Sequence, residues 1–182
     1  MGAIPDYTRA IEMEPPLNQA QYLFHRAMCF SAIGGHEEHA LQDFARSIAI
    51  YPDHPGPYHL RGKLLATELG RYDEAIADFD HLLSMHPVAE GYQLRGYAKL
   101  NLGRGRDAIP DLLEAARLEQ DTYTDYLLAW AGAVAPDDEL FYRSLAAVLQ
   151  VDPGSYRAYF LDNDDFARFR SQPRFQQLIG AA

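Results

Sequence analysis

Two short stretches of this chain hold residue types that bind metal ions. His36-Glu37-Glu38-His39 has the imidazoles and carboxylates of many zinc sites, but its histidines lie one residue closer together than those of the HExxH motif. Asp162-Asn163-Asp164-Asp165 has the acids of a calcium-binding loop without the glycine and the final glutamate of that loop. We therefore expect a solvated turn at the first stretch and helix capping at the second, with no metal site and no cofactor.

The other candidates for catalysis are isolated. Cys29, the single cysteine, lies in an apolar stretch and is typical of a core position rather than a nucleophile. Neither Gly103-Arg104-Gly105 nor Pro153-Gly154-Ser155 has the surroundings of a phosphate-binding loop or a nucleophile elbow. The sequence thus predicts no catalytic residues and a protein that is not an enzyme.

A third set of charged residues recurs along the chain. Three arginines are followed by an aspartate 17, 17 and 16 residues later. The pairs are Arg26 with Asp43, Arg61 with Asp78, and Arg95 with Asp111. In an antiparallel helical hairpin this spacing can bring guanidinium and carboxylate side by side, where a bidentate pair fixes the register of the two helices. We interpret the pairs as structural; the functional alternative is that the arginines bind acidic ligands.

The elements that position these pairs follow from a repeated pattern. Alanine, an aliphatic residue, aspartate at plus three, and an aromatic residue or leucine at plus four recur together four times. The alanines are Ala3, Ala40, Ala75 and Ala108, at intervals of 37, 35 and 33 residues. Glycine precedes the alanine by five residues in each complete copy, and proline follows it by twelve in three copies. The regularity indicates an array of similar structural units.

Each copy predicts a helical hairpin. Apolar residues at helical spacing before the glycine indicate a first helix, helix A; the glycine ends it, and helix B runs to the proline. Small residues such as Gly62 and Gly96 allow the two helices to approach closely, and Phe44, Phe79 and Leu112 are expected to fill the space between successive hairpins. Helix A has one more residue before its glycine in the first two copies than in the third, which predicts a bulge or a longer turn there.

This pattern resembles the tetratricopeptide repeat (TPR), whose signature has the glycine, Ala-x3-Phe and a terminal proline with a period of about 34 residues. The resemblance is carried by residues 19–120 and implies an all-α, right-handed superhelical TPR solenoid of stacked helix-turn-helix hairpins. We expect a single array over 1–182, with about eight main helices. Its parts are a half repeat or N-terminal helix at 1–15, repeats at 19–53, 54–87 and 88–120, a degenerate repeat at 121–153, and capping helices at 154–182.

The two ends of the array differ from the pattern. The first unit lacks a helix A, either because its helix is a natural cap or because the chain was cut from a longer protein. Pro5 and Pro110 each follow the alanine by two residues, so we expect both in the first turn of helix B. Residues 164–179 are similar to a tail, DF-x-x-L-R-x-D-P-R-F-x-x-L, that follows helical repeats in many bacterial proteins, with Phe169 and Gln172 as departures. The side chains expected over the last apolar face are Phe166, Phe169, Phe175 and Leu178.

In TPR arrays the A helices line the concave face, and the resemblance implies that ligands bind there. Counted from Ala27, Gly62 and Gly96, the positions three before, one after, and four or five after should point inward. The residues selected for a partner-binding groove are Phe24, Met28, His59, Lys63, Gln93, Tyr97 and Asn101. TPR co-chaperones that clamp the acidic C-terminus of heat-shock proteins have lysine at the first of these positions and asparagine at the second. Here the pairs are Phe24 and Met28, His59 and Lys63, and Gln93 and Tyr97, so the carboxylate clamp is absent. The alternative is that the N-terminal helix or the turns cover these residues.

Composition narrows the class of function. Sixteen basic and 26 acidic side chains give a net charge of −10, which repels nucleic acid and anionic lipid and favours basic partners. A single cysteine cannot form an intramolecular disulfide, and the first twenty residues contain no apolar signal core. We therefore expect a cytoplasmic protein with no membrane span and no nucleic-acid partner.

These observations together predict a non-catalytic protein–protein interaction module or adaptor. It would bind a peptide or a helix of a partner protein in the concave groove. One alternative is a dedicated chaperone or toxin-neutralising (immunity) partner of a specific secreted protein, which would use its negative charge against a basic client. A second is a self-assembling scaffold, in which another copy completes the first repeat, so that a homo-oligomer forms.

Overall fold

The computed structural model describes residues 2–181, so Met1 and Ala182 of the two predicted terminal segments lie outside the described residues. Every regular element in this range is a helix. The chain forms two compact units, Met1–Pro87 and Val88–Ala182. The first contains α1 (Ala3–Met13), the short η1 (Pro16–Asn18), α2 (Gln19–Ser31), α3 (Glu37–Ile50), α4 (Pro55–Thr67) and α5 (Tyr72–Met85). The second contains α6 (Ala89–Asn101), α7 (Gly105–Leu118), α8 (Thr122–Val134), α9 (Asp138–Val151), α10 (Pro153–Asp162), η2 (Asp164–Phe169) and α11 (Pro173–Ala181).

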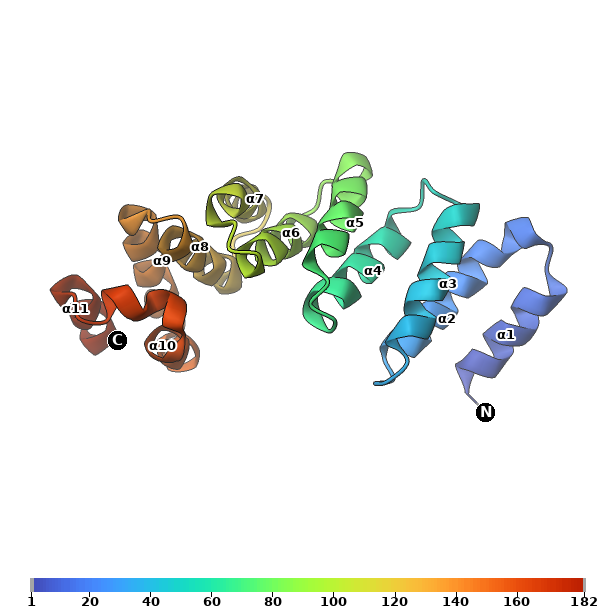
Figure 1. Ribbon diagram of the computed structural model, residues 1–182, viewed down its shortest axis with the longest axis horizontal. Coiled ribbons are helices and arrows are strands. Elements are labelled where there is room, and N and C mark those ends of the chain that lie inside the picture. The colour runs from blue at the N-terminus through green and yellow to red at the C-terminus, as the bar shows by residue number, and fades with distance from the viewer. Residues whose placement is uncertain (1, 182) are drawn as a thin grey trace. The chain divides into compact units, whose positions relative to one another are not determined.

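Both units are built from stacked helical hairpins. In the first unit α2 packs against α3 and α4 against α5, while α1 lies on α2 and α3 contacts α4 (Figure 1). In the second unit the hairpins are α6–α7 and α8–α9, joined by contacts of α7 and α6 with α8. The A helices are therefore α2, α4, α6 and α8, and the B helices are α3, α5, α7 and α9.

A glycine lies in the turn that follows each A helix of the three complete copies. Gly35, Gly70 and Gly103 have φ angles of 86°, 63° and 69°, in the left-handed region that favours glycine. The turns that follow the A helices span residues 32–36, 68–71 and 102–104. The extra residue of the first two copies therefore lengthens the turn and does not form a bulge inside the helix.

Small residues bring the two helices of a hairpin together. A Cβ atom added to Gly62 would lie 2.9 Å from the Phe79 ring, and one added to Gly96 would lie 2.7 Å from Leu112 Cδ2. Phe79 and Leu112, which were expected between successive hairpins, thus pack against helix A of their own hairpin. Leu112 also packs between hairpins, because it belongs to a buried cluster with Leu127 of the next hairpin.

The prediction for Pro110 was wrong. The B helices α3, α5 and α7 begin three residues before the repeat alanine, so Pro110 lies inside α7 rather than in its first turn. The missing N–H of Pro110 leaves one carbonyl of the preceding turn without its helical donor. Pro5 does lie in a first turn, because α1 begins at the alanine itself.

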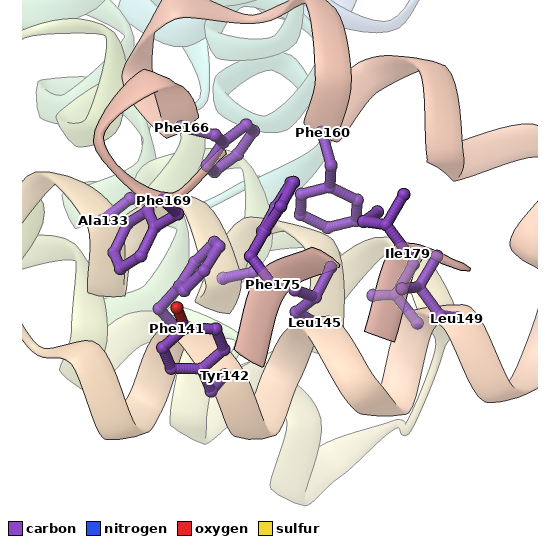
Figure 2. Packing of buried hydrophobic residues seen from close by; sticks show 12 residues of the cluster. Ala133, Phe141, Tyr142, Leu145, Leu149, Phe160, Phe166, Phe169, Phe175 and Ile179 are labelled. Atoms are coloured by element: carbon purple, nitrogen blue, oxygen red, sulfur yellow. The ribbon is translucent and has the colours of Figure 1, made fainter. Parts of the chain in front are cut away.

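Aromatic side chains close the second unit. Phe166 and Phe169 of η2 and Phe175 of α11 are buried against α9 (Figure 2). The Phe169 ring stacks on Phe141 of α9 with 3.7 Å between ring centroids. Ile179 completes this layer, whereas the predicted Leu178 is only partly buried. The tail therefore covers the apolar face of α9 that would otherwise meet water.

Candidate functional site

The recurring arginines and aspartates meet inside the hairpins. In each pair Nε and Nη2 of the arginine donate to the two carboxylate oxygens. The N–O distances are 2.7 and 2.9 Å for Arg26 and Asp43, 2.8 and 2.6 Å for Arg61 and Asp78, and 2.9 and 2.6 Å for Arg95 and Asp111. The aspartate residues are only 3–4% exposed. Each pair joins helix A to helix B, so its arginine is already committed to a carboxylate.

Two further contacts extend these pairs. Arg26 Nη1 donates to Thr8 Oγ1 at 2.9 Å, which ties α1 to the first hairpin. Lys99 Nζ donates to Asp111 Oδ2 at 2.7 Å, so that the third aspartate carries two cations. The hydrogen bond to its aspartate raises the pKa of Arg26 above its ordinary value. Sequence reasoning missed Thr8 and Lys99 because neither has a counterpart in the other copies.

Four of the predicted groove residues lie on the two A helices of the first unit. Phe24 and Met28 are one turn apart on α2, and His59 and Lys63 are one turn apart on α4. Phe24 is half-buried, with its ring 5.6 Å from the His54 ring. Met28 is 42% exposed and Lys63 is also exposed, so another molecule can reach both side chains.

A hollow of about 820 Å³ opens in the first unit beside Phe24. It lies where the end of α1, η1 and the start of α2 meet the end of α3 and the start of α4. Its lining residues are Glu14, Leu17, Asn18, Ala20, Gln21, Tyr22, Phe24, His25, Ser47, Ile50, Tyr51, His54 and Pro57. The groove prediction contained only Phe24 of this set, because the counting rule selects positions within A helices and leaves out the connecting turns.

The other three predicted groove residues lie on α6, where two of them contact α8. Gln93 Nε2 donates to Thr124 Oγ1 at 2.8 Å, and the Tyr97 ring meets Trp130 edge-on at 6.3 Å. Asn101 Nδ2 donates to the Tyr97 carbonyl oxygen at 2.9 Å. All three side chains are half-buried. Gln93 and Tyr97 therefore help to hold successive A helices together, and only part of each remains open to a ligand.

Four tyrosines of α8 and α10 gather on the second unit. We call Tyr123, Tyr126, Tyr156 and Tyr159 the tyrosine cluster. The Tyr126 ring centroid lies 6.2 Å from that of Tyr123, 5.6 Å from that of Tyr156 and 5.9 Å from that of Tyr159. Tyr123 is 38% exposed and Tyr159 is 58% exposed. The cluster is therefore a continuous aromatic surface that another molecule can reach at both ends.

A signal for part of this cluster was present in the sequence. Counted from the small residue Ala129 of α8, the position three before is Tyr126 and the position one after is Trp130. The same rule selected Phe24 and Met28 in the first copy. The rule depends on the alanine and the glycine that set the register of the other copies, and the corresponding positions of residues 121–153 hold Phe141 and Pro136.

Burial and negative charge shape the electrostatics of the tyrosine cluster. Burial raises the pKa of Tyr123 to about 12, and neighbouring tyrosines and Asp121 add to the effect. Asp125 is not among the groups that act on these tyrosines; its own pKa is raised mainly by burial and by the charge of Asp121, and the charge of Arg143 opposes the shift.

The stretches that hold metal-binding residue types serve other roles here. Among the described residues no three or more histidine, cysteine, aspartate or glutamate side chains are grouped so that they could hold a metal ion. The rings of His36 and His39 lie 5.7 and 5.2 Å from that of Phe30. Asn163 Oδ1 accepts a hydrogen bond from the backbone N–H of Asp165 at the start of η2. Within residues 2–181 no helix is both long and apolar enough to cross a membrane.

Comparisons of sequence identify one repeat family. Residues 56–88 match the family model described as tetratricopeptide repeat. Over 98 residues, 52% of this chain, the sequence is 31% identical to tetratricopeptide repeat protein 13 of Homo sapiens. The matched stretch makes up 11% of that human protein.

Solved structures share the fold at low sequence identity. YrrB, described as a TPR protein with an unusual peptide-binding site, superposes with a TM-score of 0.77 at 20% identity, over 94% of this chain and 88% of its own. A tetratricopeptide repeat protein from Parabacteroides merdae gives 0.75 at 18% identity, over 97% and 66%. MamA (residue 41 to the end) from Desulfovibrio magneticus RS-1 gives 0.71 at 20% identity, over 92% and 96%.

Proposed function

We propose that this chain, which contains a tetratricopeptide repeat and has the fold of tetratricopeptide repeat proteins, is a non-catalytic module that binds a peptide or a helix of another protein. The observation that carries the proposal is the hollow of about 820 Å³ in the first unit. Ligand sites in proteins commonly have volumes of about 300–1,000 Å³ and a mainly apolar lining with a few polar groups. The hollow lies in this range of volume, and seven of its thirteen lining residues are aliphatic or aromatic, beside six polar or charged ones.

The lining of the hollow suits a short peptide segment. Phe24, Tyr51 and Ile50 offer aromatic and aliphatic surface, and Glu14 places a carboxylate at the same site. Aromatic anchors in partly desolvated pockets contribute most of the binding free energy in many protein interfaces. Tyr51 is 54% exposed, so a partner that covered its ring would remove a large apolar area from water.

The A-helix residues extend this proposed surface beyond the hollow. In the first unit Met28, His59 and Lys63 would contact residues of the peptide that run on from the hollow. In the second unit Tyr97 and Asn101 would form a separate contact, because each unit presents its own A helices. Gln93 has a mainly structural part in this proposal, since it already donates to Thr124.

Selection of a displayed random-peptide library against the intact chain tests the proposal. Isothermal titration calorimetry of the selected peptides then gives affinities for wild type and variants. We expect Phe24→Ala and Met28→Ala to weaken binding at least about tenfold, roughly 1.4 kcal/mol, because truncation removes apolar contacts. Met85→Ala is the matched control, since Met85 has similar exposure, 38%, but lies at the end of the B helix α5.

Two further variants refine the same measurement. Tyr97→Ala should also weaken binding about tenfold for peptides that use the second unit, with its folding checked by circular dichroism because Tyr97 touches Trp130. Lys63→Ala should have a smaller effect that grows at low salt, because exposed charges are screened by ions. If no peptide is selected, or if Phe24→Ala, Met28→Ala and Tyr97→Ala all leave the affinity unchanged, the proposed binding surface is wrong.

A further inference from the structure

The tyrosine cluster is attached to the core on one side and open to solvent on the other. The Tyr126 ring packs over Phe160 and Phe166, with centroid distances of 5.7 and 6.3 Å. Both phenylalanines are completely buried. Tyr123 and Tyr159 lie at the outer edge of the cluster, where their exposed rings contribute little to that core. A rigid base with exposed aromatic rings is a preorganised surface for a ligand.

Carboxylates without a cation surround these rings. Asp121 lies close enough to the Tyr123 phenol to raise its pKa, and Asp162 lines a hollow of about 380 Å³ together with Tyr159. Among the described residues neither aspartate forms an ion pair, whereas Asp138, Asp164 and other acids of the second unit have arginine partners. Asp121 also caps α8 by accepting the backbone N–H of Thr124 at 2.9 Å.

The surrounding charge is negative overall. From residue 88 to residue 182 the sequence has 14 acidic and 10 basic residues. Arg157 on α10 already takes part in an interaction of its own. The cluster thus combines exposed, electron-rich ring faces with carboxylates that form no ion pair among the described residues.

We propose that the tyrosine cluster, with Asp121 and Asp162, binds a basic segment of the partner protein through its arginine side chains. A guanidinium is attracted to the face of a tyrosine ring within about 6 Å of the ring centroid, and it forms bidentate hydrogen bonds with carboxylates. One guanidinium lies on Tyr159 beside Asp162, and a second lies on Tyr123 near Asp121. This inference rests on the proposed function, since it assigns the chemistry of a peptide that the second unit takes.

Binding of two synthetic peptides tests the inference. The probe is the acetylated, amidated peptide GSRGSRGSR labelled with a fluorophore, and its partner has citrulline, a neutral isostere, at every arginine. Fluorescence anisotropy with the intact chain at low salt gives both affinities. We expect the arginine peptide to bind at least about tenfold more tightly than the citrulline peptide, because only the guanidinium carries charge. Equal binding of the two peptides, or no binding of either, overturns the inference.

Variants locate the contact. Tyr159→Ala, Tyr123→Ala and Asp162→Asn should each weaken the arginine peptide about threefold to tenfold, whereas Tyr159→Phe should keep most of the affinity because it keeps the ring. The matched control for Asp162→Asn is Asp73→Asn, which removes an exposed acid of the first unit and should leave the affinity unchanged.

Tyr51→Ala, a variant in the first-unit hollow, separates this inference from the proposed function. If Tyr51→Ala abolishes binding while Tyr159→Ala and Tyr123→Ala do not, the peptide binds in the first-unit hollow, which overturns the inference and supports the proposed function. If Asp162→Asn and Asp73→Asn weaken binding equally, and neither Tyr159→Ala nor Tyr123→Ala changes the affinity, only general charge attraction is present and the inference is again wrong. If the tyrosine variants act here but Phe24→Ala has no effect on library peptides, the inference holds and the first-unit surface fails.

Discussion

Removing Arg61 tests how far the buried pairs hold the hairpins together. Asp78 is only 3% exposed in the wild-type chain, and Arg61→Ala removes the two hydrogen bonds of 2.8 and 2.6 Å that satisfy its carboxylate. Breaking a buried pair in this way typically destabilises a protein by about 3–5 kcal/mol, because one charge stays buried without a partner. For a unit of this size a loss of 3 kcal/mol lowers the melting temperature by at least about 12 °C.

A control on the same unit gives the scale. Arg71 pairs with Glu74 at 2.7 Å, but both side chains are well exposed, so Arg71→Ala should lower the free energy of unfolding far less than Arg61→Ala does. Urea unfolding followed by circular dichroism measures both variants. The double variant Arg61→Leu, Asp78→Leu should regain much of the stability, because no charge is then left buried.

The outcome that refutes this reasoning is specific. If Arg61→Ala costs no more than Arg71→Ala, then water reaches Asp78 readily and burial does not set the energy of the pair. If the losses from changing Arg61 and Asp78 separately add up in the double variant, the two residues do not interact energetically. Either result would remove the argument that these pairs fix the register of helices A and B.

Three other perturbations have expected outcomes. Deleting residues 164–182 uncovers Phe141 and should lower the melting temperature and promote aggregation, measured by circular dichroism and light scattering; an unchanged melting curve would contradict this. Gly132→Ala should destabilise by about 1–3 kcal/mol, since its Cβ would lie 2.6 Å from the Phe141 backbone nitrogen, whereas Gly34→Ala, with open space around it, should be nearly neutral in urea unfolding. Burial raises the pKa of Tyr123 from 10.0 to about 12, so the folded state favours the protonated phenol. The contribution of this group to the free energy of unfolding is therefore complete below pH 10 and is lost as pH rises toward 12. Tyrosinate absorbance should therefore show a late-ionising fraction in folded protein that disappears in urea.

The hairpins could be predicted because their determinants repeat. The glycine at the repeat position of Gly70 lies in the turn after helix A in each complete copy. The spacing of Arg61 and Asp78 specifies the register of the helices that carry them. Helix starts were less predictable, and Pro110 shows why. The repeat alanine is the residue that packs closely, not the residue that begins the helix, so counting from it misplaced the first turn by three residues.

The proposed binding surfaces were less predictable for a different reason. The first-unit hollow uses Leu17 of the short η1, and Tyr51 and His54 of the turn between α3 and α4, where the period of a long helix does not fix the direction of a side chain. The tyrosine cluster joins Tyr126 of α8 to Tyr159 of α10, and the path between these helices depends on the packing of the aromatic tail. The spacing of residues in the sequence gives positions along one helix. It does not show where two helices contact each other when they do not follow the repeat pattern.

Trp130 makes the second unit observable on its own. It is the single tryptophan of the chain, its indole N–H donates to Asp165, and its ring touches Tyr97. Tryptophan emission therefore reports where α6, α8 and η2 meet, whereas far-ultraviolet circular dichroism reports helices throughout the molecule. Coincident unfolding curves from the two signals would mean that the hairpins melt cooperatively, and separated curves would mean that one group of repeats can open while the other stays folded. The wild-type chain thus carries an intrinsic optical probe confined to Val88–Ala182, without an added label.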